Sequence, residues 1–107
     1  MSLVTTHVLD TALGRPAAGV PVDLEALDDG TWRPLGHGVT DADGRVGDLG
    51  PAALPHGRYR LRFDTGTYFA GTGFYPEVVV VFEVADDAHH HVPLLLSPFA
   101  YSTYRGS

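Results

Sequence analysis

The histidines of this chain are the residues whose types and spacing are best suited to chemistry. There are six in 107 residues, and His89, His90 and His91 are consecutive. Side chains alternate between the two faces of a strand, so His89 and His91 would share one face and His90 would lie on the other. Two imidazoles placed two residues apart can converge on zinc. The alternative is a solvated turn before a strand, and because no third ligand is evident, the spacing alone leaves both interpretations open.

Two residues outside this run are candidates for acid–base or electrostatic chemistry. His7 belongs to a predicted first strand, on the same face as Thr5 and Leu9. It could act as a base, or it could be an ordinary hydrogen-bonded strand residue. Arg45 follows the turn sequence Asp41-Ala-Asp-Gly44 and would stand at the start of a short strand. The alternative for Arg45 is a surface salt bridge, which contributes little to stability.

Residues 91–107 form the most informative segment of the chain. An apolar stretch, residues 92–96, runs into Tyr101, Tyr104, Arg105 and Ser107. Chain ends usually fray. An end that follows a buried strand and carries Tyr, Arg and Ser is expected to be held in place, with the carboxylate of Ser107 as part of what it builds. The alternative is that the two tyrosines are packing residues at the edge of a sandwich.

The composition argues against several classes of protein. There is no Cys, so a disulfide framework, a thiolate nucleophile and a Cys-ligated metal are excluded. The net charge is -6, and no cluster of Lys or Arg points to nucleic acid or an anionic membrane as a partner. No Gly-x-Ser-x-Gly elbow and no phosphate-binding loop occur. No signal peptide is visible, so we expect a cytoplasmic protein.

Hydrophobic periodicity predicts an all-β chain, with residues 1–107 as a single domain. In residues 20–27 apolar side chains alternate with mostly polar ones, and in residues 58–63 arginines alternate with apolar side chains. The β-branched run Glu77–Val84 predicts a well-buried strand. Further strands are expected at residues 5–9, 31–40, 91–97 and 100–104, and a short helix at Thr65–Ala70. Turn signals at a spacing of about 8–12 residues are typical of a β-sandwich.

Several motifs together resemble the transthyretin-related proteins that act as 5-hydroxyisourate hydrolases. The resemblance covers nearly the whole chain, and its most specific part is the segment Tyr101–Ser107. Transthyretin, the hormone carrier of the same fold, lacks the Tyr-Arg-Gly-Ser ending. The motifs are Thr6-His-Val-Leu-Asp10, Gly14-Arg-Pro-Ala17, Thr40-Asp-Ala-Asp-Gly-Arg45, Tyr59-Arg-Leu-Arg-Phe63, Tyr68-Phe69, Phe74-Tyr-Pro-Glu77, His89-His-His-Val-Pro-Leu-Leu-Leu-Ser97 and Tyr101-Ser-Thr-Tyr-Arg-Gly-Ser107.

This resemblance implies a site, residue by residue. The residues that match the family's catalytic positions are His7, Arg45, His91, Tyr104 and Ser107. The residues that match its substrate-binding positions are His7, Arg45, Tyr104, Arg105 and Gly106. The resemblance also implies a transthyretin-like sandwich of two four-stranded sheets, about eight strands in all with one short helix. It implies a homotetramer with active sites in a channel between dimers, and neither a metal nor another cofactor.

Two departures from the family pattern stand out. His90 occupies a position where Tyr is usual; since it would face away from His91, we expect the chemistry to be unchanged. The loop at residues 71–73 is shorter than in many relatives, which bears on the rim of the site or on subunit packing.

The chemistry expected from the resemblance is hydrolysis of 5-hydroxyisourate to 2-oxo-4-hydroxy-4-carboxy-5-ureidoimidazoline during urate degradation. Water must lose a proton as it attacks, and the pKa of histidine, about 6.5, suits His7 or His91 as general base. Arg45 would hold the carbonyl-rich ring and stabilise the developing oxyanion. The alternatives are a transthyretin-like carrier that binds a small ligand without reaction, and a sandwich used only for protein interaction.

Overall fold

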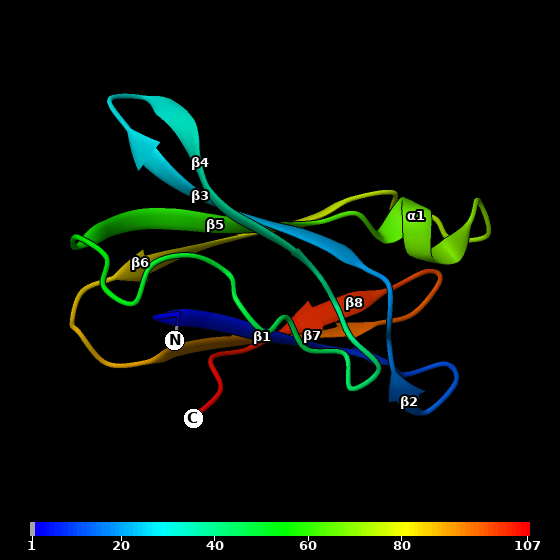
Figure 1. The fold of residues 1–107 in the computed structure, drawn as a ribbon. Helices are drawn as coiled ribbons and strands as arrows, with labels where there is room; N and C mark the ends of the chain where they lie inside the picture. The colour runs from blue at the N-terminus through cyan, green and yellow to red at the C-terminus, as the bar shows by residue number, and fades with distance from the viewer. Residues whose placement is uncertain (1) are drawn as a thin grey trace.

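The computed structural model describes residues 2–107 of the chain. Within this range, eight strands form two four-stranded sheets that lie one above the other, with one short helix at one end (Figure 1). The first sheet has the order β2-β1-β7-β8, and its strands are β1 (Val4–Asp10), β2 (Arg15–Pro16), β7 (His90–Leu96) and β8 (Tyr101–Thr103). The second has the order β4-β3-β5-β6, and its strands are β3 (Pro21–Asp28), β4 (Thr31–Val39), β5 (Gly57–Phe63) and β6 (Val78–Val84). The predicted two-sheet sandwich is therefore confirmed.

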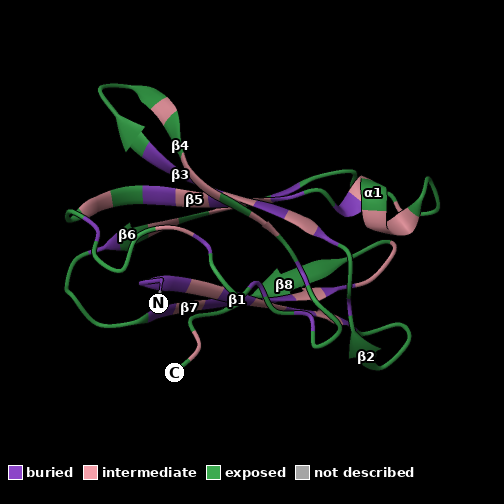
Figure 2. Ribbon diagram, viewed as in Figure 1, coloured by how far each residue is buried: buried purple, intermediate pink, exposed green. Residues whose placement is uncertain are grey.

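Buried residues of both sheets form one hydrophobic core (Figure 2). In β1 every second residue is buried, and the residues between them are half-buried, because successive side chains point to opposite faces. The same alternation in β5 buries Tyr59, Leu61 and Phe63 and turns the three arginines outward. The Glu25 carboxylate of β3 forms ion pairs with Arg60 Nε at 2.6 Å and with an Arg62 guanidinium nitrogen at 3.4 Å. These pairs are why a carboxylate is tolerated at a buried position.

Strand β6 differs from its prediction. The sequence Val78-Val-Val-Val-Phe-Glu-Val84 was expected to be well buried, but Val79 is 41% exposed and Val81 is 52% exposed. The reason is that β6 is the edge strand of its sheet and packs on the core through one face only. A β-branched run favours a strand whether one face or both are covered.

Two local features also depart from the expected pattern. The turn sequence Leu13-Gly-Arg-Pro16 contains the two-residue strand β2, which pairs with the end of β1. Strand β4 is continuous, and Pro34 and Gly36 interrupt it only through a bulge at Leu35 opposite Leu24 and Glu25 of β3. The predicted helix is confirmed as α1 (Thr65–Phe69), which begins at an Asp64 cap and ends at Ala70 in the left-handed conformation.

The first sheet positions the candidate site. Strands β1 and β7 run parallel, with Thr5 opposite His91 and His7 opposite Pro93. The connection from β4 to β5 runs along β1, where Leu3 N–H donates to Pro51 O and Val8 N–H to Gly44 O (Figure 1). Residues from three distant parts of the chain therefore meet at β1. No helix within residues 2–107 has the length and apolar character needed to cross a membrane.

Candidate active site

A pocket of about 240 Å³ opens beside β1 and β7. Of the residues predicted for the site, Arg45, His91 and Ser107 line this pocket. They come from the loop after β4, from β7 and from the segment after β8, so the fold brings together side chains that are far apart in sequence. The residues that line the pocket are Thr5, Thr6, Arg45, Val46, His89, His91 and Ser107.

The turn before Arg45 is fixed by Asp41. The Asp41 carboxylate accepts from the backbone N–H of Asp43 at 2.9 Å and of Arg45 at 3.1 Å. Gly44 takes φ +77°, and a Cβ at this position would collide with the carbonyl oxygen of Val8. The turn can therefore lie against β1 only with glycine at this position. The backbone of Arg45 then forms a bridge with His7, which places an exposed guanidinium beside the pocket.

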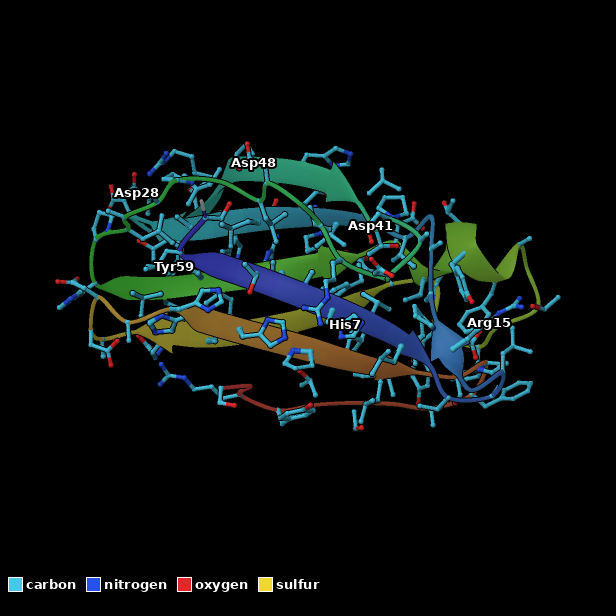
Figure 3. The ribbon with its side chains drawn as sticks, turned by 60° about the horizontal axis from the view of Figure 1, so that its bottom comes forward. His7, Arg15, Asp28, Asp41, Asp48 and Tyr59 are labelled. Atoms are coloured by element: carbon cyan, nitrogen blue, oxygen red, sulfur yellow. The ribbon has the colours of Figure 1, made fainter. Side chains whose placement is uncertain are left out.

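His7 lies on the outward side of β1, as predicted from its alternation with buried residues (Figure 3). Its Nε2 is 2.8 Å from the carbonyl oxygen of Asp43. A carbonyl only accepts, so Nε2 carries the hydrogen and, in the neutral ring, Nδ1 is the nitrogen able to take a proton. His7 is thus adjacent to Arg45 through the backbone, although its ring is not among the side chains that line the pocket.

The ring of His91 is held from two sides. Its Nδ1 is 2.8 Å from Thr5 Oγ1. Gly106 N–H donates to the backbone carbonyl oxygen of His91 at 2.8 Å, and on the Cδ2 side of the ring a Cβ on Gly106 would stand only 2.5 Å from His91 Cδ2. Burial, and then the charges of Arg45, His89 and His7, lower the pKa of His91 below its ordinary value. This shift favours the neutral ring, which is the form that can accept a proton.

Tyr104, Arg105 and Gly106 have different positions relative to the pocket. Tyr104 and Arg105 are exposed and do not line it in the described chain. Gly106 is not among the residues that line the pocket, and a Cβ added to it would stand 2.5 Å from His91 Cδ2. The bridge between His91 and Gly106 shows that this segment is held in place, as the sequence predicted. The catalytic roles assigned to these residues stay predictions.

His90 and His91 begin β7, His89 directly precedes it, and the side chains of the run alternate in direction as predicted. His90 is buried and its Nδ1 donates to the carbonyl oxygen of Ala88 at 2.6 Å, whereas His89 is exposed and lines the pocket with His91. Among residues 2–107, no group of three or more His, Asp or Glu side chains is arranged to hold a metal ion.

Thr5 was absent from the predicted site, and His89 was considered only as a possible zinc ligand. Thr5 Oγ1 is 2.8 Å from His89 Nε2 as well as from His91 Nδ1. The sequence indicated that Thr5 and His7 share a face and that His89 and His91 share a face. It carried no signal that β1 pairs with β7, and this pairing is what joins the two sets.

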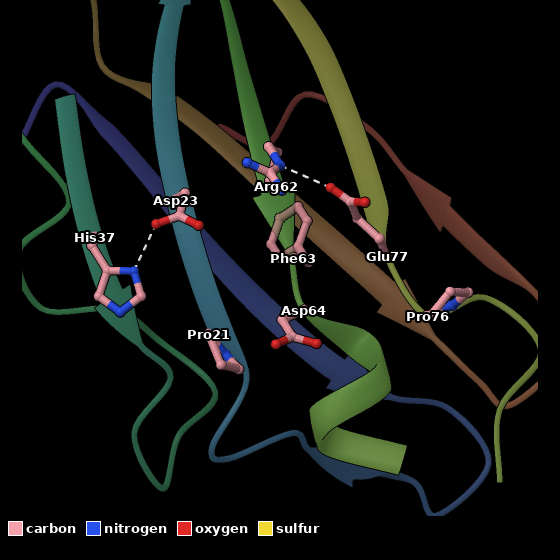
Figure 4. A pocket seen from close by; sticks show the side chains of 8 residues that line it. All are labelled: Pro21, Asp23, His37, Arg62, Phe63, Asp64, Pro76 and Glu77. Carbon is pink, nitrogen blue, oxygen red and sulfur yellow. Dashed lines mark hydrogen bonds and ion pairs between the residues drawn. The ribbon is translucent and has the colours of Figure 1, made fainter. Parts of the chain in front are cut away.

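A second pocket, of about 360 Å³, lies on the other sheet near α1 (Figure 4). Its charged residues are largely paired with one another: Asp23 bonds to His37 at 2.7 Å, and Arg62 to Glu77 at 2.8 Å. It contains none of the residues predicted for the site. The pocket beside β1 and β7 is therefore the better candidate.

The chain resembles proteins of known function over nearly its full length. It is 47% identical over 112 residues to 5-hydroxyisourate hydrolase of Salmonella dublin, which covers 99% of this chain and 82% of that protein. It is also 47% identical over 120 residues to the uric acid degradation bifunctional protein TTL of Arabidopsis thaliana. That match covers 97% of this chain but only 37% of the larger protein.

Solved structures of similar proteins support the same family relationship. The structure of Klebsiella pneumoniae 5-hydroxyisourate hydrolase aligns with a TM-score of 0.85 at 39% identity, covering 97% of this chain and 98% of that one. Transthyretin from Sparus aurata aligns with a TM-score of 0.91 at 34% identity, covering 99% of this chain and 97% of that one. The HIUase/Transthyretin family model matches residues 4–106. Since this match spans almost the whole chain, the chain belongs to the HIUase/transthyretin family.

Proposed function

We propose that this chain hydrolyses 5-hydroxyisourate to 2-oxo-4-hydroxy-4-carboxy-5-ureidoimidazoline, a reaction of urate degradation. The observation that carries the proposal is the meeting of Arg45, His91 and Ser107 in one pocket, with His7 bridged to Arg45. These residues lie in a chain that is 47% identical to a protein named 5-hydroxyisourate hydrolase. A neutral imidazole, a guanidinium and a hydroxyl are suited to splitting a cyclic amide by water.

Water activation is assigned to the two histidines. The lowered pKa of His91 leaves its ring free to accept a proton near neutral pH. His7, with the hydrogen on Nε2 directed at Asp43 O, offers Nδ1 as the second basic nitrogen. In this mechanism one ring takes the proton of the attacking water and the other helps to hold that water.

Arg45 is assigned to the substrate ring and to the oxyanion. Its planar donor fork matches adjacent carbonyl oxygens and remains charged at all working pH values. As water adds, the carbonyl oxygen becomes an anion, and a guanidinium that is already in place stabilises this charge without reorganising. The fixed turn from Asp41 to Gly44 supports such a role because it holds the Arg45 backbone in place.

Tyr104, Arg105, Gly106 and Ser107 complete the proposed site. Ser107 lines the pocket and can orient water or a histidine, and Gly106 lets the backbone approach His91. Tyr104 is 57% exposed, so its hydroxyl and ring are available to cover a planar substrate. Arg105 is exposed and would pair with a carboxylate or with the substrate.

A homotetramer would supply the walls that a single chain lacks. Arg45, Tyr104 and Ser107 are exposed, whereas a reacting amide needs a site with little bulk water. The edge strands also carry exposed apolar side chains, Val79 and Val81 on β6 and Tyr101 on β8. Exposed edges and apolar patches favour association. We therefore propose active sites between dimers, and light scattering that found an active monomer would contradict this assembly.

A carrier without catalysis is the second candidate function. The TM-score of 0.91 to transthyretin from Sparus aurata supports it, because the two folds are nearly superimposable. The lining of the pocket does not, since a channel for an apolar ligand gains nothing from Arg45, His89 and His91. A cytoplasmic location stays a prediction from the sequence.

The deciding experiment follows the absorbance of freshly prepared 5-hydroxyisourate with and without the protein. We expect faster decay with the protein, and turnover reduced about 10²-fold or more in His7→Asn and in His91→Asn. The matched control is His56→Asn, an exposed histidine on the surface near Asp87, which should leave the rate unchanged. Parental rates in both site variants would remove the histidines from the mechanism, and unchanged decay with the wild type would contradict the function.

A further inference from the structure

The hydroxyl of Thr5 lies between two imidazole rings. Thr5 Oγ1 is 2.8 Å from His91 Nδ1 and 2.8 Å from His89 Nε2. The centroids of the two rings are 6.1 Å apart, with an angle of 30° between the ring planes. Thr5 is also the residue of β1 that stands opposite His91 in the parallel pairing with β7. The contact is therefore built into the strand register.

This arrangement restricts where the hydrogens can lie. A hydroxyl has one hydrogen, so Thr5 can donate to only one of the two rings, and the other ring must donate to Thr5. A neutral imidazole has one N–H. If His91 donates from Nδ1, its Nε2 has no hydrogen; if His91 accepts at Nδ1, its Nε2 is already protonated.

The remaining contacts show which part of the His91 ring can face a reactant. The Nδ1 side lies against Thr5, and the Cδ2 side lies against the backbone of Gly106. Within residues 2–107 the Nε2 atom makes no hydrogen bond, so it is the nitrogen available to a reactant in the pocket that His91 lines. The ring can take a proton from water there only when Nε2 is bare, which requires the hydrogen to be on Nδ1.

We propose that Thr5 and His89 are positioning residues for His91. Thr5 Oγ1 accepts the Nδ1 hydrogen of His91 and gives its own hydrogen to His89 Nε2, so that His91 is held in the tautomer whose Nε2 is a base. This inference rests on the proposed function for the use of that base. The hydrogen-bond arrangement itself does not depend on any substrate.

The charged and titratable groups near His91 are consistent with this role. Arg45, His89 and His7 act on its ring, and together with burial they disfavour the imidazolium form. A ring that stays neutral has a single hydrogen to place, so its tautomer decides which nitrogen can react. The Thr5 hydroxyl fixes the tautomer of His91 by hydrogen bonding, and this neutral group adds no charge near Arg45.

The first test reads the tautomer of His91 without substrate. Nitrogen-15 NMR of the full labelled chain at about pH 8, where histidines are neutral, distinguishes a protonated Nδ1 from a protonated Nε2, and His91→Asn identifies the signals. We expect the hydrogen on Nδ1 in the wild type and in Thr5→Ser, and a mixture of tautomers in Thr5→Val. A wild-type His91 protonated at Nε2 would overturn the inference.

The second test measures kcat and KM for 5-hydroxyisourate. Thr5→Val should lower kcat at least about 10-fold with little change in KM, as for loss of the outer partner of a functional histidine, and Thr5→Ser should restore most of it. His89→Gln, which keeps an acceptor near Nε2, should lose less than His89→Leu. The matched control is Thr11→Val: Thr11 directly follows β1, its hydroxyl donates to Leu96 O at the end of β7 at 3.2 Å, and its loss should leave kcat unchanged.

The two proposals fail in different ways. Equal kcat in Thr5→Val and the wild type would overturn the role of Thr5 while leaving the hydrolase assignment in place. A wild-type chain that does not act on 5-hydroxyisourate would contradict the proposed function, and the NMR spectrum would still decide the position of the His91 hydrogen.

Discussion

The backbone N–H of Gly106 donates to the carbonyl oxygen of His91 at 2.8 Å, and the imidazole of His91 packs against Gly106 itself. A Cβ at residue 106 would stand 2.5 Å from His91 Cδ2 and 3.3 Å from Pro93 Cγ. The segment after β8 therefore supports a candidate catalytic ring, and only a residue without a side chain leaves that ring where it is.

Replacing Gly106 with Ala should displace the His91 ring. A shift of about 1 Å in a reacting group can cost about 10²-fold in rate, so we expect kcat for Gly106→Ala to fall between about 10-fold and 10²-fold. Gly57→Ala is the matched control, because nothing lies within 4 Å of the added Cβ. Steady-state kinetics check this, and a Gly106→Ala enzyme as active as Gly57→Ala would contradict the close support of His91.

The dependence of activity on pH should reflect the lowered pKa of His91. In the proposed mechanism the neutral ring is the active form, so we expect full activity at neutral pH and a fall as the pH drops through a pKa below the ordinary value of 6.5. Burial is the main cause and Arg45 the next, so Arg45→Gln should raise the pKa and move this acid limb to higher pH. The rate at neutral pH should also fall by about 10²-fold, the scale of losing one oxyanion donor.

Arg45→Lys separates the two effects of the guanidinium. It keeps the positive charge, so the acid limb should stay near its wild-type position, but it loses the planar fork and should still lower kcat. The measurement is the pH profile of kcat for the three proteins. An acid limb that is identical in the wild type and in Arg45→Gln would show that Arg45 does not influence His91.

Much of the fold could be predicted from the sequence because alternation is a local property. The strand predicted at residues 58–63 from its period of two is β5, the strand expected at residues 5–9 is β1, and the short helix expected at Thr65–Ala70 is α1. The exposure of Val79 and Val81 could not be predicted, since it depends on β6 being at the edge of its sheet. The position of a strand within a sheet is decided by pairing, which leaves little trace in the strand itself.

The site was less predictable for a related reason. His7, Arg45 and His91 were found through motifs, and each motif is a short stretch of sequence. The contact of Thr5 with both His89 and His91 needs two strands about 86 residues apart to pair in one register, and only the structure gives that register. Motif matching identifies candidate residues for contact with substrate more readily than it identifies the residues that hold those side chains in place.

Tyr68 should contribute to stability and leave activity unchanged. Its hydroxyl donates to the buried Asp10 carboxylate at 2.6 Å, and that carboxylate also accepts from the backbone N–H of Ala12 and Leu13. Tyr68→Phe removes one partner of a buried carboxylate, so we expect a loss of about 1–3 kcal/mol and a melting temperature lower by several degrees.

The matched control is Tyr75→Phe, a more exposed tyrosine that packs against Phe74 and Tyr101. Burial, and then the bond and charge of Asp10, raise the pKa of Tyr68 from 10.0 to about 12. Because the protonated phenol is the donor, its contribution should be full below pH 10.0 and lost as the pH rises to about 12. Thermal unfolding of both variants checks this, and equal melting temperatures would contradict it.

Removal of metal should not affect activity. His89 Nε2 and His91 Nδ1 both bond to Thr5, and no third metal-binding side chain joins them in the described range 2–107. A structural or catalytic zinc site needs at least three protein ligands. We expect the same rate before and after treatment with a chelator; loss of activity that zinc restores would revive the interpretation of these histidines as ligands.

Deletion of residues 105–107 tests whether the segment after β8 belongs to the site. Strand β8 ends at Thr103, so the deletion leaves its pairing with β7 intact. It removes the charge of Arg105, the bridge from Gly106 to His91 and the Ser107 side of the pocket.

The three deleted residues are exposed or half-buried, so the melting temperature should change by only a few degrees, as for a loss of about 1 kcal/mol. Activity should fall at least about 10²-fold, because the backbone support of His91 and the charge of Arg105 are lost together. Arg105→Gln is the companion variant, and its smaller loss would separate the charge from the support of His91. A shortened chain that hydrolyses 5-hydroxyisourate at the parental rate would show that this segment only ends the sheet.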